Sequence, residues 1–188
     1  MELRELICLL TPEEERSSLE ELIGDFEEEE PESFFDRYPE LVNGYDSAQT
    51  FAEEIRDRVV TLGTVLIWYL AERGLLMVVD WDGEEEENLL ASYVNYRLES
   101  LGADFTVDTE EFYPWAEEEG LEAEDGSLVW SLLQEVDRQL RNQGFRLLGF
   151  DTFCEPDSIY LGVLPEGLAD TFLRAGVTDV DIAAPEDL

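Results

Sequence analysis

Acidic residues are distributed along the entire chain, and this distribution constrains the fold more than any other feature. The 188 residues include 48 Asp and Glu against 11 arginines, with neither lysine nor histidine, which gives a net charge of −37. The net charge is −14 over residues 1–60, −13 over residues 61–120 and −10 over residues 121–188. No acidic tail accounts for the excess, so a folded body must carry it on its surface. Hydrophobic residues make up 44% of the chain, and they recur at regular spacings. The chain can therefore fold as a single domain of residues 1–188.

A surface this negative repels nucleic acids and anionic lipids, and it attracts basic proteins and cations. Three interpretations of the charge remain open: ordinary solubility, adaptation to high salt, and an acidic face that masks a basic partner, as in nuclease inhibitors and DNA mimics. The 32 Glu against 16 Asp argue against salt adaptation, since salt-adapted surfaces usually favour Asp. We expect a basic protein as partner, and neither nucleic acid nor membrane.

The sequence also predicts a cytoplasmic protein. Its longest apolar run, Thr64–Leu70, is far shorter than the ~18 residues that a membrane helix needs. The first five residues carry acids where a signal peptide carries bases. Cys8 and Cys154 each lie among apolar neighbours, which is more typical of buried thiols than of a disulfide or a metal site.

Residues 1–62 have the pattern of a helical N-terminal part. Thr11, Pro12 and Glu14 resemble a capping box with proline at the first helical position, and they predict a helix that follows. Apolar residues at helical spacing predict two more helices, at about residues 32–42 and 47–62.

Residues 63–188 have the pattern of a sheet-containing part. The β-branched and aromatic runs Thr64–Leu70 and Leu75–Trp81 predict a hairpin, and a helix that continues through Leu70 is the alternative. Further strands are expected at residues 105–107, 145–151, 159–164 and 177–182, and helices at 84–101, 127–142 and 166–175. The expected fold is α+β: a mixed sheet of about six strands flanked by helices, with the N-terminal helices packed on one side.

The order of these elements raises the question of an internal repeat. Residues 64–107 and residues 145–182 both read strand, strand, helix, glycine, strand. A diverged ββαβ repeat around one sheet would account for this order, and chance recurrence of common elements is the alternative.

The missing residue types exclude many enzyme mechanisms. Without histidine the chain has neither Ser-His-Asp nor Cys-His catalysis and no His-ligated metal site. Without lysine it has neither Schiff-base chemistry nor a P-loop phosphate clamp. These exclusions favour binding over catalysis.

The strongest enzymatic motif is an apolar strand that ends in Asp-x-Asp-Gly. The segment LLMVVDWDG, residues 75–83, resembles the nucleophile motif of the haloacid-dehalogenase-like phosphatases. That resemblance implies Asp80 as nucleophile, Asp82 as general acid and Mg²⁺ as the ion that neutralises the phosphate. The chain departs from the family pattern at Glu84, where Thr or Val is expected, and it has no lysine to hold a phosphoryl group.

The same residues are the candidates for a weak divalent-cation site. Asp80, Asp82 and Glu84 supply carboxylate oxygens at short spacing, although the spacing does not match a calcium-binding loop. The structural alternative is a strand end whose Asp residues cap the next helix. No other cofactor is expected.

The segment around residue 115 has the composition of a protein-binding surface. Phe112, Tyr113 and Trp115 stand between acidic residues, as rigid aromatics do at interface hot spots. Glu117–Glu119 follow directly, so the candidate binding residues also include Glu117, Glu118 and Glu119. The alternative is that the aromatic residues cover the core beneath a loop or broken helix.

Two further stretches carry a resemblance. LLGFDTFCEPDSIYLGVLP, residues 147–165, and VVDWDGEEEE, residues 78–87, look like small acidic bacterial proteins of unknown function, some of which sit beside toxin genes as immunity factors. This resemblance implies non-catalytic binding of a basic protein, as in an immunity or inhibitor protein. The alternative function is a metal-dependent phosphatase-like enzyme centred on Asp80 and Asp82.

Overall fold

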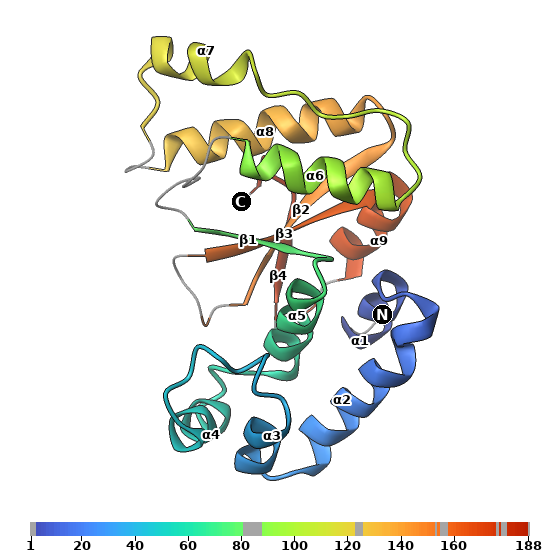
Figure 1. The fold of residues 1–188 in the computed structure, drawn as a ribbon, viewed down its shortest axis with the longest axis vertical. Coiled ribbons are helices and arrows are strands. Elements are labelled where there is room, and N and C mark those ends of the chain that lie inside the picture. The colour runs from blue at the N-terminus through green and yellow to red at the C-terminus, as the bar shows by residue number, and fades with distance from the viewer. Residues whose placement is uncertain are drawn as a thin grey trace.

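The computed structural model describes residues 3–80, 88–122, 126–152, 154, 158–175, 177 and 180–187. Figure 1 shows the arrangement of its helices and strands. The helices are α1 (Leu3–Leu10), the short 3-10 helix η1 (Glu13–Glu15), α2 (Arg16–Glu28), α3 (Pro31–Arg37), α4 (Ala48–Arg56), α5 (Leu62–Glu72), α6 (Leu89–Ser100), α7 (Phe112–Glu119), α8 (Ser127–Arg141) and α9 (Glu166–Ala175). The strands are β1 (Met77–Asp80), β2 (Phe145–Asp151), β3 (Ser158–Pro165) and β4 (Asp181–Ala183).

The strands form one antiparallel sheet in the order β1-β3-β2-β4, with every neighbouring pair antiparallel. The predicted α+β class is confirmed. The predicted mixed sheet of about six strands is wrong, because the described residues contain four strands and no parallel pair. Of the expected strands, Thr64–Leu70 is helical and Phe105–Val107 is irregular.

The two central strands, β2 and β3, are buried on both faces. Along β3, Ile159 and Leu161 point into one hydrophobic core, whereas Tyr160 and Leu164 point into the other. This alternation follows from the two-residue period of a strand. A strand covered on both sides reads as a continuous apolar run, which is why the sequence predicted both central strands with nearly correct bounds.

Helices cover both faces of the sheet (Figure 1). On one side, α6, α7 and α8 share a core with residues such as Leu147 and Val163. On the other side, α1–α5 and α9 form one core with the sheet, through residues such as Leu22, Phe51 and Phe150. The N-terminal helices therefore share the core on this side of the sheet, where α1 and α2 pack against α5 and α3 packs against α4. None of the helices in the described part of the chain combines the length and the apolar character that a membrane crossing demands.

The segment predicted as the first strand of a hairpin is the central helix α5. A reciprocal capping box begins it: Thr64 N donates to Thr61 Oγ1, and Thr61 N donates to Thr64 Oγ1, both at 3.3 Å. The helix is buried on most sides, and such a helix is apolar nearly all round, so its sequence resembles that of a buried strand. The alternative of one long helix through Leu70 is correct about the helical state of this segment and wrong about its continuity, because α4 ends at Arg56 and α5 begins at Leu62.

The capping box predicted at Thr11 is also wrong. Thr11 Oγ1 donates a hydrogen bond of 2.9 Å to Ile7 O, so this side chain closes the end of α1. The following helix starts through the 3-10 turn η1, and Pro12, which precedes η1, provides no side-chain cap.

The internal ββαβ repeat is not confirmed. Its first proposed copy, residues 64–107, has α5 where the first strand was expected, and β1 is the single strand among its described residues. Its second proposed copy, residues 145–182, does contain β2, β3 and α9 in the expected order, and β4 begins at its end.

Candidate functional site

Helix α7 carries the aromatic and acidic residues that the sequence singles out. Phe112 and Ala116, about one turn apart, are buried in the core beneath the helix. Because an α-helix has 3.6 residues per turn, its outer side carries Trp115, Glu118 and Glu119. Trp115 is 47% exposed, and both glutamates are exposed. Phe112 is therefore a core residue, whereas Trp115 faces solvent.

The helix divides the remaining predicted binding residues between two sides. Tyr113 and Glu117, four residues apart, line a separate hollow, whereas Trp115 lines the space between α7 and α8. The Tyr113 hydroxyl accepts a hydrogen bond of 3.0 Å from the backbone N–H of Asn88, which ties this side of α7 to the start of α6. The structure does not bring all the predicted residues onto one surface.

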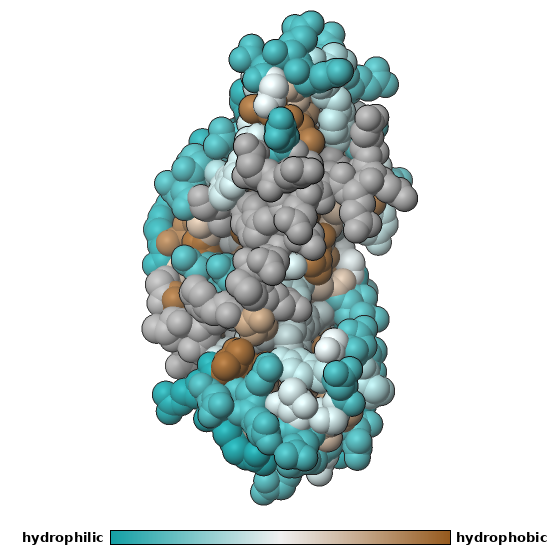
Figure 2. All heavy atoms as spheres, turned by 90° about the vertical axis from the view of Figure 1, so that its left-hand side faces the viewer, coloured by the Kyte–Doolittle hydropathy of each residue, from teal (hydrophilic) through white to brown (hydrophobic). Residues whose placement is uncertain are grey.

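A groove of about 850 Å³ lies between α7 and α8, and we call it the α7–α8 groove. Phe112 and Trp115 form its apolar part, with their ring centroids 5.6 Å apart. Its charged lining residues are three carboxylates and one guanidinium, those of Asp108, Glu111, Glu135 and Arg138. Figure 2 shows that hydrophilic residues dominate the end of the molecule where α7 lies, with hydrophobic atoms between them.

Hydrogen bonds hold one wall of this groove in place. Gln139 Nε2 donates to Asp108 O and to Glu135 Oε1, both at 2.8 Å, and Gln139 Oε1 accepts from Asp108 N at 3.0 Å. Arg138 donates to the two Glu135 oxygens at 2.6 and 2.8 Å. This pairing holds the pKa of the Glu135 carboxyl below its usual range, although burial opposes the effect. Since Glu135 neutralises Arg138, the net negative charge of the groove comes from Asp108 and Glu111.

Two of the three predicted metal ligands, Asp82 and Glu84, lie outside the described residues. The third, Asp80, is the last residue of β1, where it pairs with Ser158. In the parts of the chain that the structure describes, no three Cys, Asp or Glu side chains form a group able to hold a metal ion. Weak cation binding at these three residues stays a prediction.

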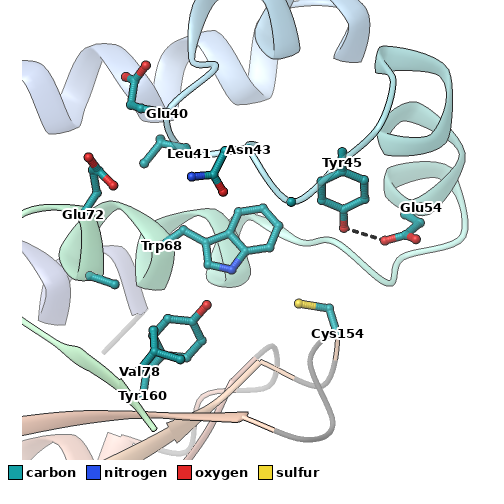
Figure 3. A pocket seen from close by; sticks show the side chains of 12 residues that line it. Glu40, Leu41, Asn43, Tyr45, Glu54, Trp68, Glu72, Val78, Cys154 and Tyr160 are labelled. Carbon is teal, nitrogen blue, oxygen red and sulfur yellow. Dashed lines mark hydrogen bonds between the residues drawn. The ribbon is translucent and has the colours of Figure 1, made fainter. Parts of the chain in front are cut away.

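Another hollow, drawn in Figure 3, was not predicted from the sequence. It has a volume of about 490 Å³ and lies between the N-terminal helical layer and the sheet, and we call it the Trp68 pocket. Its aromatic and acidic lining residues are Glu40, Tyr45, Glu54, Trp68, Glu72 and Tyr160. They come from separate segments, so no local spacing joins them. The one sequence signal was a tryptophan inside an aliphatic run, which we interpreted as a strand.

Comparison with known proteins gives a family and no closer relative. A search of curated proteins and a search of solved structures each found no significant match. Residues 2–182 match the profile of one protein family, so the match covers most of the chain. The chain belongs to the family described as a domain of unknown function (DUF6630).

Proposed function

We propose that this protein binds a basic segment of a partner protein through the α7–α8 groove, without catalysing a reaction. Trp115 is the observation that carries the proposal: it is 47% exposed at the wall of a groove whose uncompensated charges are carboxylates. A tryptophan in a pocket ringed by polar residues is a typical anchor of a protein interface. The surrounding acids select a positively charged segment.

The charge and the anchor have different roles in this proposal. A net charge of −37, with Glu118 and Glu119 next to Trp115 on the helix, steers a basic partner toward the groove. The hydrogen bonds of Gln139 fix one wall in advance, so less conformational entropy is lost on binding. Trp115 then holds the complex by burying its indole.

Such binding would make the protein an inhibitor or an immunity-like factor. A basic protein surface that recognises nucleic acid can also bind carboxylates on a rigid scaffold, because carboxylates and phosphates both carry negative charge. The partner class that we propose is therefore a protein with an exposed run of Arg or Lys whose activity depends on that run.

The described residues give no support to the phosphatase-like alternative. Strand β1 lies at an edge of the sheet and runs antiparallel to β3, so Asp80 lies beside the start of β3. Ligand sites of open parallel sheets form where the carboxyl ends of neighbouring strands meet, which these four strands do not provide.

To test the proposal, the immobilised protein and its variants are used as baits in a native lysate at about 0.3 M NaCl. The association and dissociation rates of any basic protein that is recovered are then measured on an immobilised surface. Trp115→Ala should lose the partner, because removal of a hot-spot tryptophan costs about 2 kcal/mol or more, roughly thirtyfold in Kd and mainly in the dissociation rate. Glu118→Gln/Glu119→Gln should slow association severalfold at low salt, and Glu117→Gln should slow it less.

Two variants serve as matched controls. Tyr96 is 61% exposed on α6 outside the groove, so Tyr96→Ala removes a more accessible aromatic ring and should leave dissociation unchanged. Glu27→Gln/Glu28→Gln removes the same two charges from α2. If this pair slows association as much as the α7 pair, or if Trp115→Ala retains the partner, binding does not use the α7–α8 groove.

A further inference from the structure

The Trp68 pocket is walled by aromatic rings from three parts of the fold. Trp68 comes from α5, Tyr160 from β3 and Tyr45 from the loop before α4. Figure 3 shows the indole of Trp68 in the middle of the pocket, with Tyr45 and Tyr160 on different sides of it. The Tyr45 and Trp68 ring centroids are 6.1 Å apart at an interplanar angle of 60°. A group that enters the pocket therefore meets ring faces and edges.

The charged residues that line this pocket are all acidic. Glu40 and Glu72 lie on one side of Trp68, and Glu54 lies on the other (Figure 3). The Tyr45 hydroxyl donates to Glu54 Oε2 at 2.5 Å, which fixes that carboxylate at the wall. No arginine is among the described residues that line the pocket. Carboxylates next to aromatic faces attract cations and repel anions.

A different side of the same helix, at its end, shows what such an arrangement accommodates. The guanidinium of Arg73 lies 3.6 Å from the centroid of the Tyr69 ring, and its Nε is 2.7 Å from a Glu15 carboxylate oxygen. An aromatic face and a carboxylate together hold a guanidinium there. The Trp68 pocket repeats these two components, and its described lining contains no guanidinium of the chain's own.

We propose that the Trp68 pocket binds a ligand with a guanidinium head group. The planar head stacks on the indole, which is the aromatic ring that attracts cations most strongly, and donates hydrogen bonds to both Glu54 and Glu72. A volume of about 490 Å³ holds the head and a short alkyl chain. The site is independent of the α7–α8 groove, which lies toward the other end of the molecule (Figure 1).

The experiment is calorimetric titration of the full chain with propylguanidinium at about 0.15 M NaCl, where long-range attraction is screened. Propylurea has the same shape without the charge and should show no binding. Glu54→Gln and Glu72→Gln should each weaken propylguanidinium binding by about tenfold, because each removes a charge-assisted hydrogen bond. Trp68→Phe should weaken it severalfold, because phenylalanine attracts cations less than tryptophan does.

Glu53→Gln is the matched control, since Glu53 is exposed on the same helix as Glu54 but does not line the pocket. It should change the affinity by less than twofold. A second ligand, acetyl-Gly-Arg-Gly-amide, distinguishes the two possible sources of the head group. If this peptide binds at least as tightly as propylguanidinium, the natural ligand is an arginine of a protein. If it binds more weakly, the natural ligand is a free small molecule.

Three results would overturn the proposal: no propylguanidinium binding at ~10 mM, equal binding of propylurea, or equal losses in Glu53→Gln and Glu54→Gln. Circular dichroism checks that each variant is folded, and the two Glu→Gln changes at the pocket test the site separately, so one misfolded variant does not decide the outcome. Failure here leaves the α7–α8 groove untouched, because none of these substitutions lies in it.

Discussion

Asp137 joins three segments of the chain through one carboxylate. Its side chain is 3% exposed on α8, and it accepts hydrogen bonds from Arg141 Nε at 2.6 Å and from Leu147 N at 2.8 Å. Arg146 Nε lies 3.4 Å away. Glu186 in turn pairs with both arginines, so the C-terminal segment is held against α8 and β2. The carboxylate thus accepts a hydrogen bond from a buried backbone N–H of the central sheet and forms ion pairs with two arginines.

We expect Asp137→Ala to lower the free energy of unfolding by about 3–5 kcal/mol, since it leaves a buried N–H without its acceptor and removes one of the two carboxylates that pair with Arg146. Asp170→Ala is the control: Asp170 also pairs with an arginine four residues on, but both side chains are exposed, so the loss should stay below about 1 kcal/mol. Urea denaturation followed by circular dichroism measures both. Similar losses would mean that burial adds nothing to the Asp137 interactions.

The way in which each helix or strand is buried decided whether the sequence predicted it correctly. α8 has a single apolar face and β2 is covered on both sides, so their periods are unambiguous and both were predicted within one residue. α5 is surrounded by other elements, and an all-round apolar helix has no period that separates it from a strand. Because the α5 segment was predicted as a strand of the sheet, the fully antiparallel arrangement of the four described strands could not be predicted.

Local sequence patterns were also insufficient to predict the geometry of the candidate sites. Pro114 and Gly120 led us to expect a loop or broken helix around Trp115. Pro114 lies in the first turn of α7, where its missing N–H costs nothing, and Gly120 ends the helix with φ +72°. Without a helix, the separation of Tyr113 from Trp115 could not be derived. The Trp68 pocket depends on contacts between distant segments, which no local pattern encodes.

Gly162 allows the packing between β3 and its neighbours to be tested. A Cβ there would lie 2.8 Å from Leu76 Cδ2 and 3.2 Å from Phe150 Cε2. Gly162→Ala should therefore destabilise the protein by about 1–3 kcal/mol through overpacking. In α2, a Cβ on Gly24 would meet nothing within 4 Å, so Gly24→Ala should stabilise by up to ~1 kcal/mol through helix propensity. Thermal melts of the two variants should shift in opposite directions, and a shared direction would contradict this packing.

Across the whole molecule, the negative charge is distributed over every layer. Arginines pair with acids in both parts of the chain, as in Arg37 with Asp25 and Glu29, and Arg174 with Asp170. With 48 acids and 11 arginines, most carboxylates have no cation of the chain to pair with. Their mutual repulsion opposes the compact state.

Stability should therefore rise with salt. Screening acts over about 8 Å at 0.15 M ionic strength, so the melting temperature should climb between ~0.01 and ~0.5 M NaCl. Glu27→Gln/Glu28→Gln should raise the melting temperature at low salt and have less effect at high salt, because it removes part of the same repulsion. A flat profile would show that the carboxylates are already well spaced. A requirement for molar salt would instead support salt adaptation.

The position of β1 gives this charge a second consequence. β1 forms one edge of the described sheet, and its Val78 is 47% exposed. An open strand edge presents unpaired backbone N–H and C=O groups to which a strand of another copy can add. At neutral pH two copies with a charge of −37 each repel one another before their edges meet. As the pH approaches the isoelectric point of about 4.1 that barrier disappears, and edge-to-edge aggregation through β1 becomes the expected fate of concentrated solutions.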